Sequence, residues 1–238
     1  MLIKAAINGG RTKAEHPSIP VTPEEQAAAV LECLTAGARA IHLHVRARDG
    51  VESLATEDVA RTLRAVRSAA PHAKIGISTG AWIVPEPAER IRLATAWEVL
   101  PDFASVNFHE AGAKELAQVL LSKGVDIEAG LCDAGDAETF VKSGLAPRCL
   151  RVLLEPQEQE IEKARGTVQK IEAVLGDGEI SLQRLLHGTE ATTWRILKDA
   201  VDRGYGVRIG LEDTLQLSNG AMARSNAELV AEALRLTT

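Results

Sequence analysis

The chain has 238 residues, of which 45% are hydrophobic and 25% charged, and its formal net charge is −6. This length predicts one large core rather than two independent domains, and the composition is typical of a soluble globular protein. The negative charge and the aromatic content of only 3% argue against a nucleic-acid-binding surface, and no apolar run approaches the roughly 20 residues that a membrane span needs.

The amino-terminal sequence and the cysteines predict a cytoplasmic protein. Residues 2–7 form an apolar run with no basic region before a long apolar segment and no cleavage site, so the pattern of a signal peptide is missing. Cys33, Cys132 and Cys149 are odd in number, widely spaced and without a CxxC pair. Such cysteines are typical of reduced thiols rather than of a disulfide framework.

Short apolar runs alternate with amphipathic helical patterns along the chain. Thr22 as N-cap, Pro23 and Glu25 predict the start of the first helix, which Gly37 ends, and Thr56 opens the second helix in a similar way. Each predicted strand precedes a helical pattern. The strands are predicted at residues 2–8, 40–46, 74–80, 103–108, 126–132, 149–155, 181–187 and 207–212.

This alternation predicts an α/β fold with a parallel sheet. About eight β/α units in about 240 residues match a TIM (β/α)8 barrel, here a single domain over residues 1–238. The alternative is a doubly wound open sheet, but the chain has neither the GxGxxG motif nor the P-loop that would favour a nucleotide-binding sheet of that kind.

The second predicted strand carries two histidines on one face. His42 and His44 are two residues apart, so their imidazoles project side by side from a strand. Two neutral imidazoles held in this way make half of a zinc site, because zinc satisfies both nitrogens at once. The alternative is a strand whose histidines cap unrelated polar groups.

A third ligand is available where the eighth predicted strand ends. The alternation there places Arg208 and Glu212 on one face, and Asp213 begins the following loop. Two histidines and one glutamate would leave a coordination position open, which is the mark of a catalytic zinc. The alternative is that Glu212 and Asp213 only begin a solvated loop or cap the next helix.

In a barrel the carboxyl ends of the strands converge on one mouth, where such enzymes carry out their chemistry. Closing the eighth strand onto the first would bring Glu212 within reach of His42 and His44. Polar side chains gather at these strand ends. In chain order they are Asn8, Arg11, His42, His44, Ser78, Thr79, Ser105, Asn107, Glu128, Glu155, His187, Arg208, Glu212 and Asp213.

Several of these residues lie in longer motifs. The first group joins NGGRT at 8–12 and HPSIPVTPEE at 16–25 to HLHVR at 42–46, the second is ISTG at 77–80 with SVN at 105–107, and the third is RIGLED at 208–213 with SNA at 225–227. These motifs, at compatible spacing, resemble the β-keto acid cleavage enzymes.

The resemblance implies a TIM barrel with zinc held by His42, His44 and Glu212. Members of this family react a β-keto acid with acetyl-CoA to give acetoacetate and a new acyl-CoA, and they are commonly homo-oligomers. By analogy, Asp213 would be the catalytic base and Arg208 would orient it, while the hydroxyl of Ser78 would assist at the substrate. The implied substrate-binding residues are Asn8, Arg11, Thr79, Gly80, Ser105, Asn107 and Glu128.

The chain departs from the family pattern in two places. Arg11 stands where a family member carries a glutamate that matches an amino-bearing substrate, so a neutral or dicarboxylic β-keto acid is expected; the alternative is a structural ion pair of Arg11 with Asp213 or Glu128. Residues 155–160, EPQEQE, replace a glycine-rich loop after strand six, and their acidity would repel a phosphate-bearing cofactor.

The acidic segment at 155–160 leaves a second function open, that of a zinc hydrolase or an aldolase or lyase that acts on a small oxo acid without CoA. A third possibility, a barrel with a structural or regulatory zinc, is least consistent with the set Ser78, Arg208, Glu212 and Asp213. His187 and Glu155 also end predicted strands, and His187 is a candidate acid–base group, whereas His109 is expected to be a loop residue.

Overall fold

In the computed structural model, eight parallel strands within the described residues, 1–237, close into a barrel, and β1 pairs with both β2 and β8. The prediction of a TIM barrel is therefore confirmed. The strands are β1 Ile3–Ala6, β2 Ala40–Leu43, β3 Ile75–Ser78, β4 Phe103–Asn107, β5 Asp126–Leu131, β6 Arg151–Leu154, β7 Gln183–Leu186 and β8 Gly206–Ile209. All lie within their predicted ranges except β8, which begins one residue early at a glycine that carries no apolar signal.

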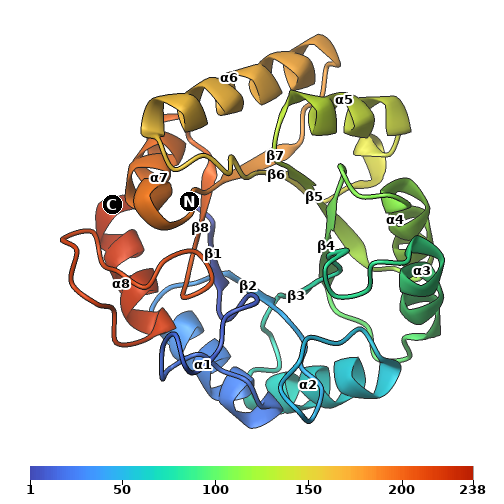
Figure 1. Cartoon of the computed structure of the whole chain (residues 1–238), viewed down its shortest axis with the longest axis vertical. Helices are drawn as coiled ribbons and strands as arrows, with labels where there is room; N and C mark the ends of the chain where they lie inside the picture. Colours follow the sequence, from blue (N-terminus) through green and yellow to red (C-terminus); the bar gives the residue numbers. More distant parts are fainter. Residues whose placement is uncertain (238) are drawn as a thin grey trace.

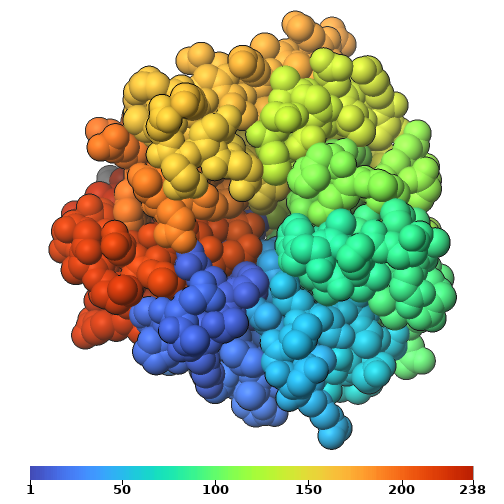
Figure 2. All heavy atoms as spheres, viewed as in Figure 1, coloured from blue at the N-terminus to red at the C-terminus, as the bar shows by residue number. Residues whose placement is uncertain are grey.

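Helices surround the barrel (Figure 1), and successive segments follow one another around the molecule in sequence order (Figure 2). None of the helices in residues 1–237 is both long enough and apolar enough to cross a membrane. The helices are α1 Pro23–Thr35, α2 Thr56–Ala69, α3 Pro87–Ala96, α4 Ala113–Ser122, α5 Ala134–Ser143, α6 Ile161–Asp177, α7 Thr193–Asp202 and α8 Asn226–Thr237, with short 3-10 turns at Ala146–Arg148 and Glu190–Thr192.

Two predicted helix starts behave differently. The Thr22 hydroxyl accepts a hydrogen bond from the Glu25 backbone, and the Glu25 carboxylate accepts one from the Thr22 backbone, so the predicted capping box begins α1. Thr56 is the first residue of α2, but the N-cap is Ala55 and no side chain caps the helix. Instead, the Ser53 hydroxyl accepts a hydrogen bond from the Ala55 backbone.

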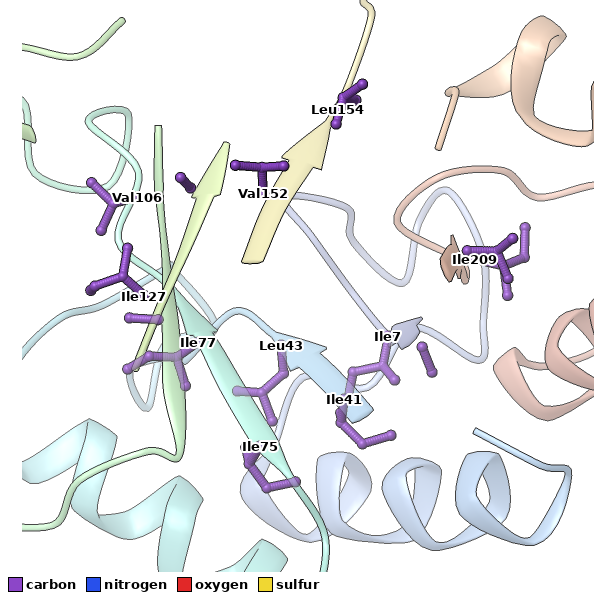
Figure 3. Packing of buried hydrophobic residues seen from close by; sticks show 14 of the residues in the cluster. Ile7, Ile41, Leu43, Ile75, Ile77, Val106, Ile127, Val152, Leu154 and Ile209 are labelled. Carbon is purple, nitrogen blue, oxygen red and sulfur yellow. The ribbon is translucent and has the colours of Figure 1, made fainter. Parts of the chain in front are cut away.

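Alternation along the strands separates the two sides of the barrel wall. Most outward side chains are apolar and buried, as Ile41 and Ile75 illustrate where they lie between the strands and the surrounding helices (Figure 3). Residues of the opposite parity, such as His42 in β2 and Arg208 in β8, turn into the barrel. The same period that builds the core therefore delivers polar side chains to the interior.

A buried ion cluster fills part of that interior. Glu128 in β5 is fully buried and accepts hydrogen bonds from Lys4 in β1 and Arg151 in β6, and the Arg151 guanidinium lies 4.6 Å from the centre of the Phe103 ring. Burial lowers the pKa of Lys4 to about 8, although Glu128 favours its charged form. The two cations compensate the charge of Glu128 in the buried interior.

Candidate active site

A cavity of about 400 Å³ opens at the carboxyl ends of the strands. A larger hollow of about 860 Å³ lies beside Met1, Arg184 and Tyr205 at the other end of β7 and β8, but none of its described lining residues is a histidine. The smaller cavity is the candidate site because it gathers most of the polar strand ends. Of the predicted residues, it is lined by His42, His44, Ser78, Ser105, Asn107, Glu155, His187, Arg208, Glu212 and Asp213.

The two histidines face each other, as strand alternation predicts. Their Nε2 atoms lie 3.2 Å apart and their ring centres 5.1 Å apart. His42 belongs to β2, and His44 follows the strand directly; the Asn8 amide holds the backbone at this point by accepting from the His44 N–H and donating to the His44 carbonyl. Both rings are almost fully buried.

Glu212 completes the group from the loop after β8. Its Oε1 lies 3.4 Å from His44 Nε2 and its Oε2 3.8 Å from His42 Nε2. Gly9 makes this approach possible, because its φ is +53° and a Cβ there would lie 2.4 Å from the Glu212 Cγ. Gly210 similarly allows β8 to approach β1, since a Cβ there would lie 1.9 Å from the Ala6 carbonyl oxygen.

The spacing of these three side chains suits a tetrahedral metal ion. Zinc ligands about 2.0–2.1 Å from the ion lie about 3.3–3.4 Å from one another at tetrahedral angles, close to the 3.2 to 3.8 Å found here. The Glu212 Oε2 is buried and has no hydrogen-bond partner among the described residues, as expected of an atom that binds a cation. His42, His44 and Glu212 therefore fit zinc.

The charges around His42 and Glu212, but not those around His44, favour the protonation states that a cation requires. Burial holds the pKa of His42 well below its usual range, despite the Glu212 carboxylate. Burial would raise the pKa of Glu212, but Arg208 and the histidines outweigh it and hold this pKa well below its usual range. Burial also opposes the charge on His44, yet Glu212 and Glu52 raise its pKa to about 9, so a metal would displace a proton there.

Two residues that the sequence did not indicate hold His44 in place. The Glu52 carboxylate accepts a hydrogen bond from His44 Nδ1 and another from the Trp82 indole N–H, and the Trp82 ring stacks on the imidazole at a centre distance of 6.0 Å. Arg46 and Glu52 form an antiparallel bridge, so the loop folds back on β2 and carries Glu52 to the ring. A carboxylate behind a ligating imidazole fixes its tautomer and orientation.

Replacing Glu52 by glutamine is expected to weaken zinc binding by roughly 10- to 100-fold, because the amide keeps the size of the side chain but loses the charge that supports His44. Zinc affinity can be measured by competition with a chromogenic chelator. Glu57→Gln, at an exposed position in the first turn of α2, is the matched control and should leave the affinity unchanged. Equal affinity of the Glu52 variant and the wild type would exclude this role.

A second network lies beside the three side chains. The Arg208 guanidinium donates to Asp213 Oδ1 at 2.8 Å from Nη2 and at 3.1 Å from Nε, and it also contacts Glu212. Asp213 is fully buried, and its Oδ1 lies 3.4 Å from His187 Nδ1, while His187 Nε2 lies 3.4 Å from the Glu155 carboxylate. Arg208 thus holds the Asp213 carboxylate from one side, and the His187 ring faces it from the other, although His187 Nδ1 has no hydrogen-bond partner among the described residues.

Five predicted substrate-binding residues do not line the cavity. Glu128 is turned into the buried ion cluster, so the prediction that it contacts substrate is corrected. Asn8 bonds the His44 backbone, Thr79 donates to the Ser105 carbonyl, and a side chain at Gly80 would meet the Trp82 ring, so these residues shape the wall instead.

Arg11 also lies outside the cavity lining. Its guanidinium pairs with Glu190 and Glu15 and donates to the Glu212 carbonyl at 3.3 Å, rather than to Asp213 or Glu128. Its charge is paired with carboxylates outside the cavity lining, and its contact with a substrate carboxylate stays a prediction.

The sequence profile of the beta-keto acid cleavage enzyme matches residues 1–238, which is the whole chain. The chain belongs to the beta-keto acid cleavage enzyme family. The resemblance seen in the motifs at 8–46, 77–107 and 208–227 is therefore confirmed, and the cavity of this family member is a candidate active site of an enzyme.

Curated relatives of this family member match along nearly its whole length. The 3-keto-5-aminohexanoate cleavage enzyme of Fusobacterium nucleatum is 28% identical over 253 residues, covering 99% of the chain and 90% of that enzyme. The 3-oxoadipate:acetyl-CoA acetyltransferase of Cupriavidus necator is 27% identical over 258 residues, covering 99% of the chain and 87% of that enzyme.

A solved structure supports the fold. The ternary complex of ObcA with a C4-CoA adduct and oxalate superposes with a TM-score of 0.76 at 16% identity, over 92% of the chain. The chain spans 63% of the length of that ObcA chain.

Proposed function

We propose that this beta-keto acid cleavage enzyme is zinc-dependent and transfers the CoA of acetyl-CoA to the acyl part of a β-keto acid, giving acetoacetate and a new acyl-CoA. The observation that carries the proposal is the convergence of His42, His44 and Glu212 with the Arg208–Asp213 pair in one cavity. The name of the Cupriavidus necator relative, an acetyl-CoA acetyltransferase, supports acetyl-CoA as the co-substrate.

The proposed roles follow from where the side chains lie. Zinc held by His42, His44 and Glu212 would supply Lewis-acid polarisation of the 3-keto group. Ser78, Ser105 and Asn107 line the same cavity and offer hydroxyl and amide groups to the carboxylate and keto oxygens of the substrate, which they would orient. We assign binding and orientation, rather than proton transfer, to these three side chains.

Asp213 is the proposed base. Its carboxylate would accept a proton from C2 of the β-keto acid, after which C2 attacks the thioester carbonyl carbon of acetyl-CoA and displaces the CoA thiolate. The thiolate would then add to the keto carbon, and cleavage of the C2–C3 bond with return of the proton to C2 would give acetoacetate and the new acyl-CoA. Burial opposes the charge of Arg208, but Asp213 and Glu212 outweigh it and raise the pKa of Arg208, so the guanidinium stays charged and fixed beside the base. The His187 ring lies between Asp213 and Glu155 and faces the second side of the carboxylate.

The lining of the cavity supports a second candidate function. Arg208 is the one lysine or arginine among the described lining residues, and it already pairs with two carboxylates. Glu155 and Gln157 line the cavity on the side of the acidic segment at 155–160. A phosphate-bearing cofactor gains no cation from these residues, which favours a CoA-independent zinc hydrolase or an aldolase or lyase that acts on a small oxo acid.

One experiment separates the two functions. The zinc-loaded protein is incubated with acetyl-CoA and a panel of neutral, cationic and dicarboxylic β-keto acids, and CoA species are followed by mass spectrometry. A new acyl-CoA together with acetoacetate would support the transferase, and the acid that responds would define the charge that the cavity accepts. Cleavage of a keto acid without any new thioester would support the CoA-independent enzyme.

A further inference from the structure

A second group of metal-binding side chains lies at the same end of the barrel. His109, Cys132 and Asp136 each offer a ligand atom, and these atoms all lie within 4.8 Å of one another. His109 Nδ1 is 3.3 Å from the Asp136 Oδ2. His109 and Cys132 line the cavity, so the group faces the candidate active site although it shares no residue with His42, His44 and Glu212.

The register of the barrel brings these side chains together. β4 and β5 pair with Asn107 opposite Gly130, and His109 and Cys132 each follow two residues later. Asp136 lies in the first turn of α5, where its backbone N–H donates to the Asp133 carboxylate at 3.0 Å. Its own Oδ2 accepts from the Cys132 backbone N–H at 2.8 Å, which fixes the carboxylate beside the thiol.

The ligand types point to a particular class of ion. An imidazole nitrogen, a thiolate sulfur and a carboxylate oxygen together suit zinc or a similar borderline-soft divalent ion better than calcium or magnesium, which prefer oxygen ligands alone. The Gln157 amide donates to the Cys132 sulfur at 3.8 Å.

The local charge also favours a cation. The amino end of α5 carries a partial positive charge, but Asp133 and Asp136 lie at its start and offset it. The Glu155 carboxylate lines the same cavity as His109 and Cys132 and adds to the negative charge near the group.

We propose that His109, Cys132 and Asp136 form a second binding site for a divalent ion of the zinc type, built on β4, β5 and α5, with an open position toward the cavity. The inference does not rest on the proposed function, because it concerns a different set of ligands. A protein with both sites filled would hold two ions per chain, one carried by β2 and β8 and the other by this second group.

Metal stoichiometry tests the site. The full chain is dialysed against excess zinc, passed through a desalting column and analysed for zinc per chain by inductively coupled plasma mass spectrometry. Two zinc ions per chain are expected for the wild type and one for His109→Ala, for Cys132→Ser and for His42→Ala. His72→Ala and Cys149→Ser change a histidine and a cysteine outside the group and should keep two.

Cobalt substitution supplies a readout that reports the thiolate directly. Cobalt-loaded wild type and His42→Ala should both show a sulfur-to-cobalt charge-transfer band, which should persist in Cys149→Ser and disappear in Cys132→Ser. One zinc per chain in the wild type that His109→Ala does not remove would overturn the proposal, and so would a charge-transfer band that survives in Cys132→Ser. His109 is about half exposed, so its variant keeps the test valid if Cys132→Ser folds poorly.

Discussion

Asp213→Asn is expected to lower turnover by about 10² to 10⁴-fold, the usual contribution of a positioned general base, while zinc remains bound. The amide has the shape of the carboxylate, so the cavity keeps its form, but it cannot take up a proton. Zinc binding should persist because His42, His44 and Glu212 are unchanged. Turnover is measured with acetyl-CoA and the responding keto acid, and zinc per chain is measured on the same sample.

The Asp213 variant also removes a charge next to buried Arg208, which retains only Glu212 as a partner on this side. Thermal unfolding of the variant should therefore be monitored, because loss of stability would lower activity for another reason. Asp199→Asn is the matched control: Asp199 also pairs with an arginine, Arg165 at 2.7 Å, but on α7 outside the cavity, and its turnover should be unaffected. Wild-type turnover in a folded Asp213→Asn protein would exclude Asp213 as the base.

His42→Ala is expected to remove both zinc from the first site and turnover. Loss of one of three protein ligands should weaken binding beyond the roughly 10- to 100-fold range that outer partners contribute. Chelator competition measures the zinc affinity, and the CoA assay measures turnover. His42→Ala should lose zinc binding and turnover together, whereas Asp213→Asn should lose turnover and keep zinc binding.

His16→Ala is the matched control for His42→Ala. His16 is also a buried histidine, but its ring bonds the Ala223 carbonyl at 2.8 Å and the Ser18 backbone, away from the cavity lining. This variant can lose stability without losing zinc. Full turnover by a zinc-free His42→Ala protein would contradict the proposed metal dependence, whichever keto acid is used.

Most of the predictions about the candidate site came from the alternation of side chains along the strands. A period of two residues places His42 and His44 on the same side of one strand, and closure of the barrel brings Glu212 to them. Neither step needs side-chain detail. Glu52 was missed because its position depends on how the loop from Arg46 bends back, and a loop of that kind has no sequence period.

The layer of the barrel interior in which a side chain lies was harder to predict than whether the side chain points inward or outward. Glu128 faces the interior, as its parity indicates, but it bonds Lys4 and Arg151 instead of lining the cavity. The alternation along a strand shows which side chains point into the barrel. It does not show in which layer of the interior each side chain lies. Arg11 was predicted to lie at the carboxyl ends of the strands. Its partners Glu190 and Glu15 come from a 3-10 turn and a loop, and no local sequence pattern shows that these segments approach Arg11.

The buried cluster of Lys4, Glu128, Arg151 and Phe103 has a kinetic consequence. These side chains occupy the barrel interior away from the cavity lining, so we expect substrates to enter at the carboxyl ends of the strands, where the cavity lies. Substrates and products would then share this entrance, so a product that stays in the cavity should inhibit turnover in steady-state kinetics.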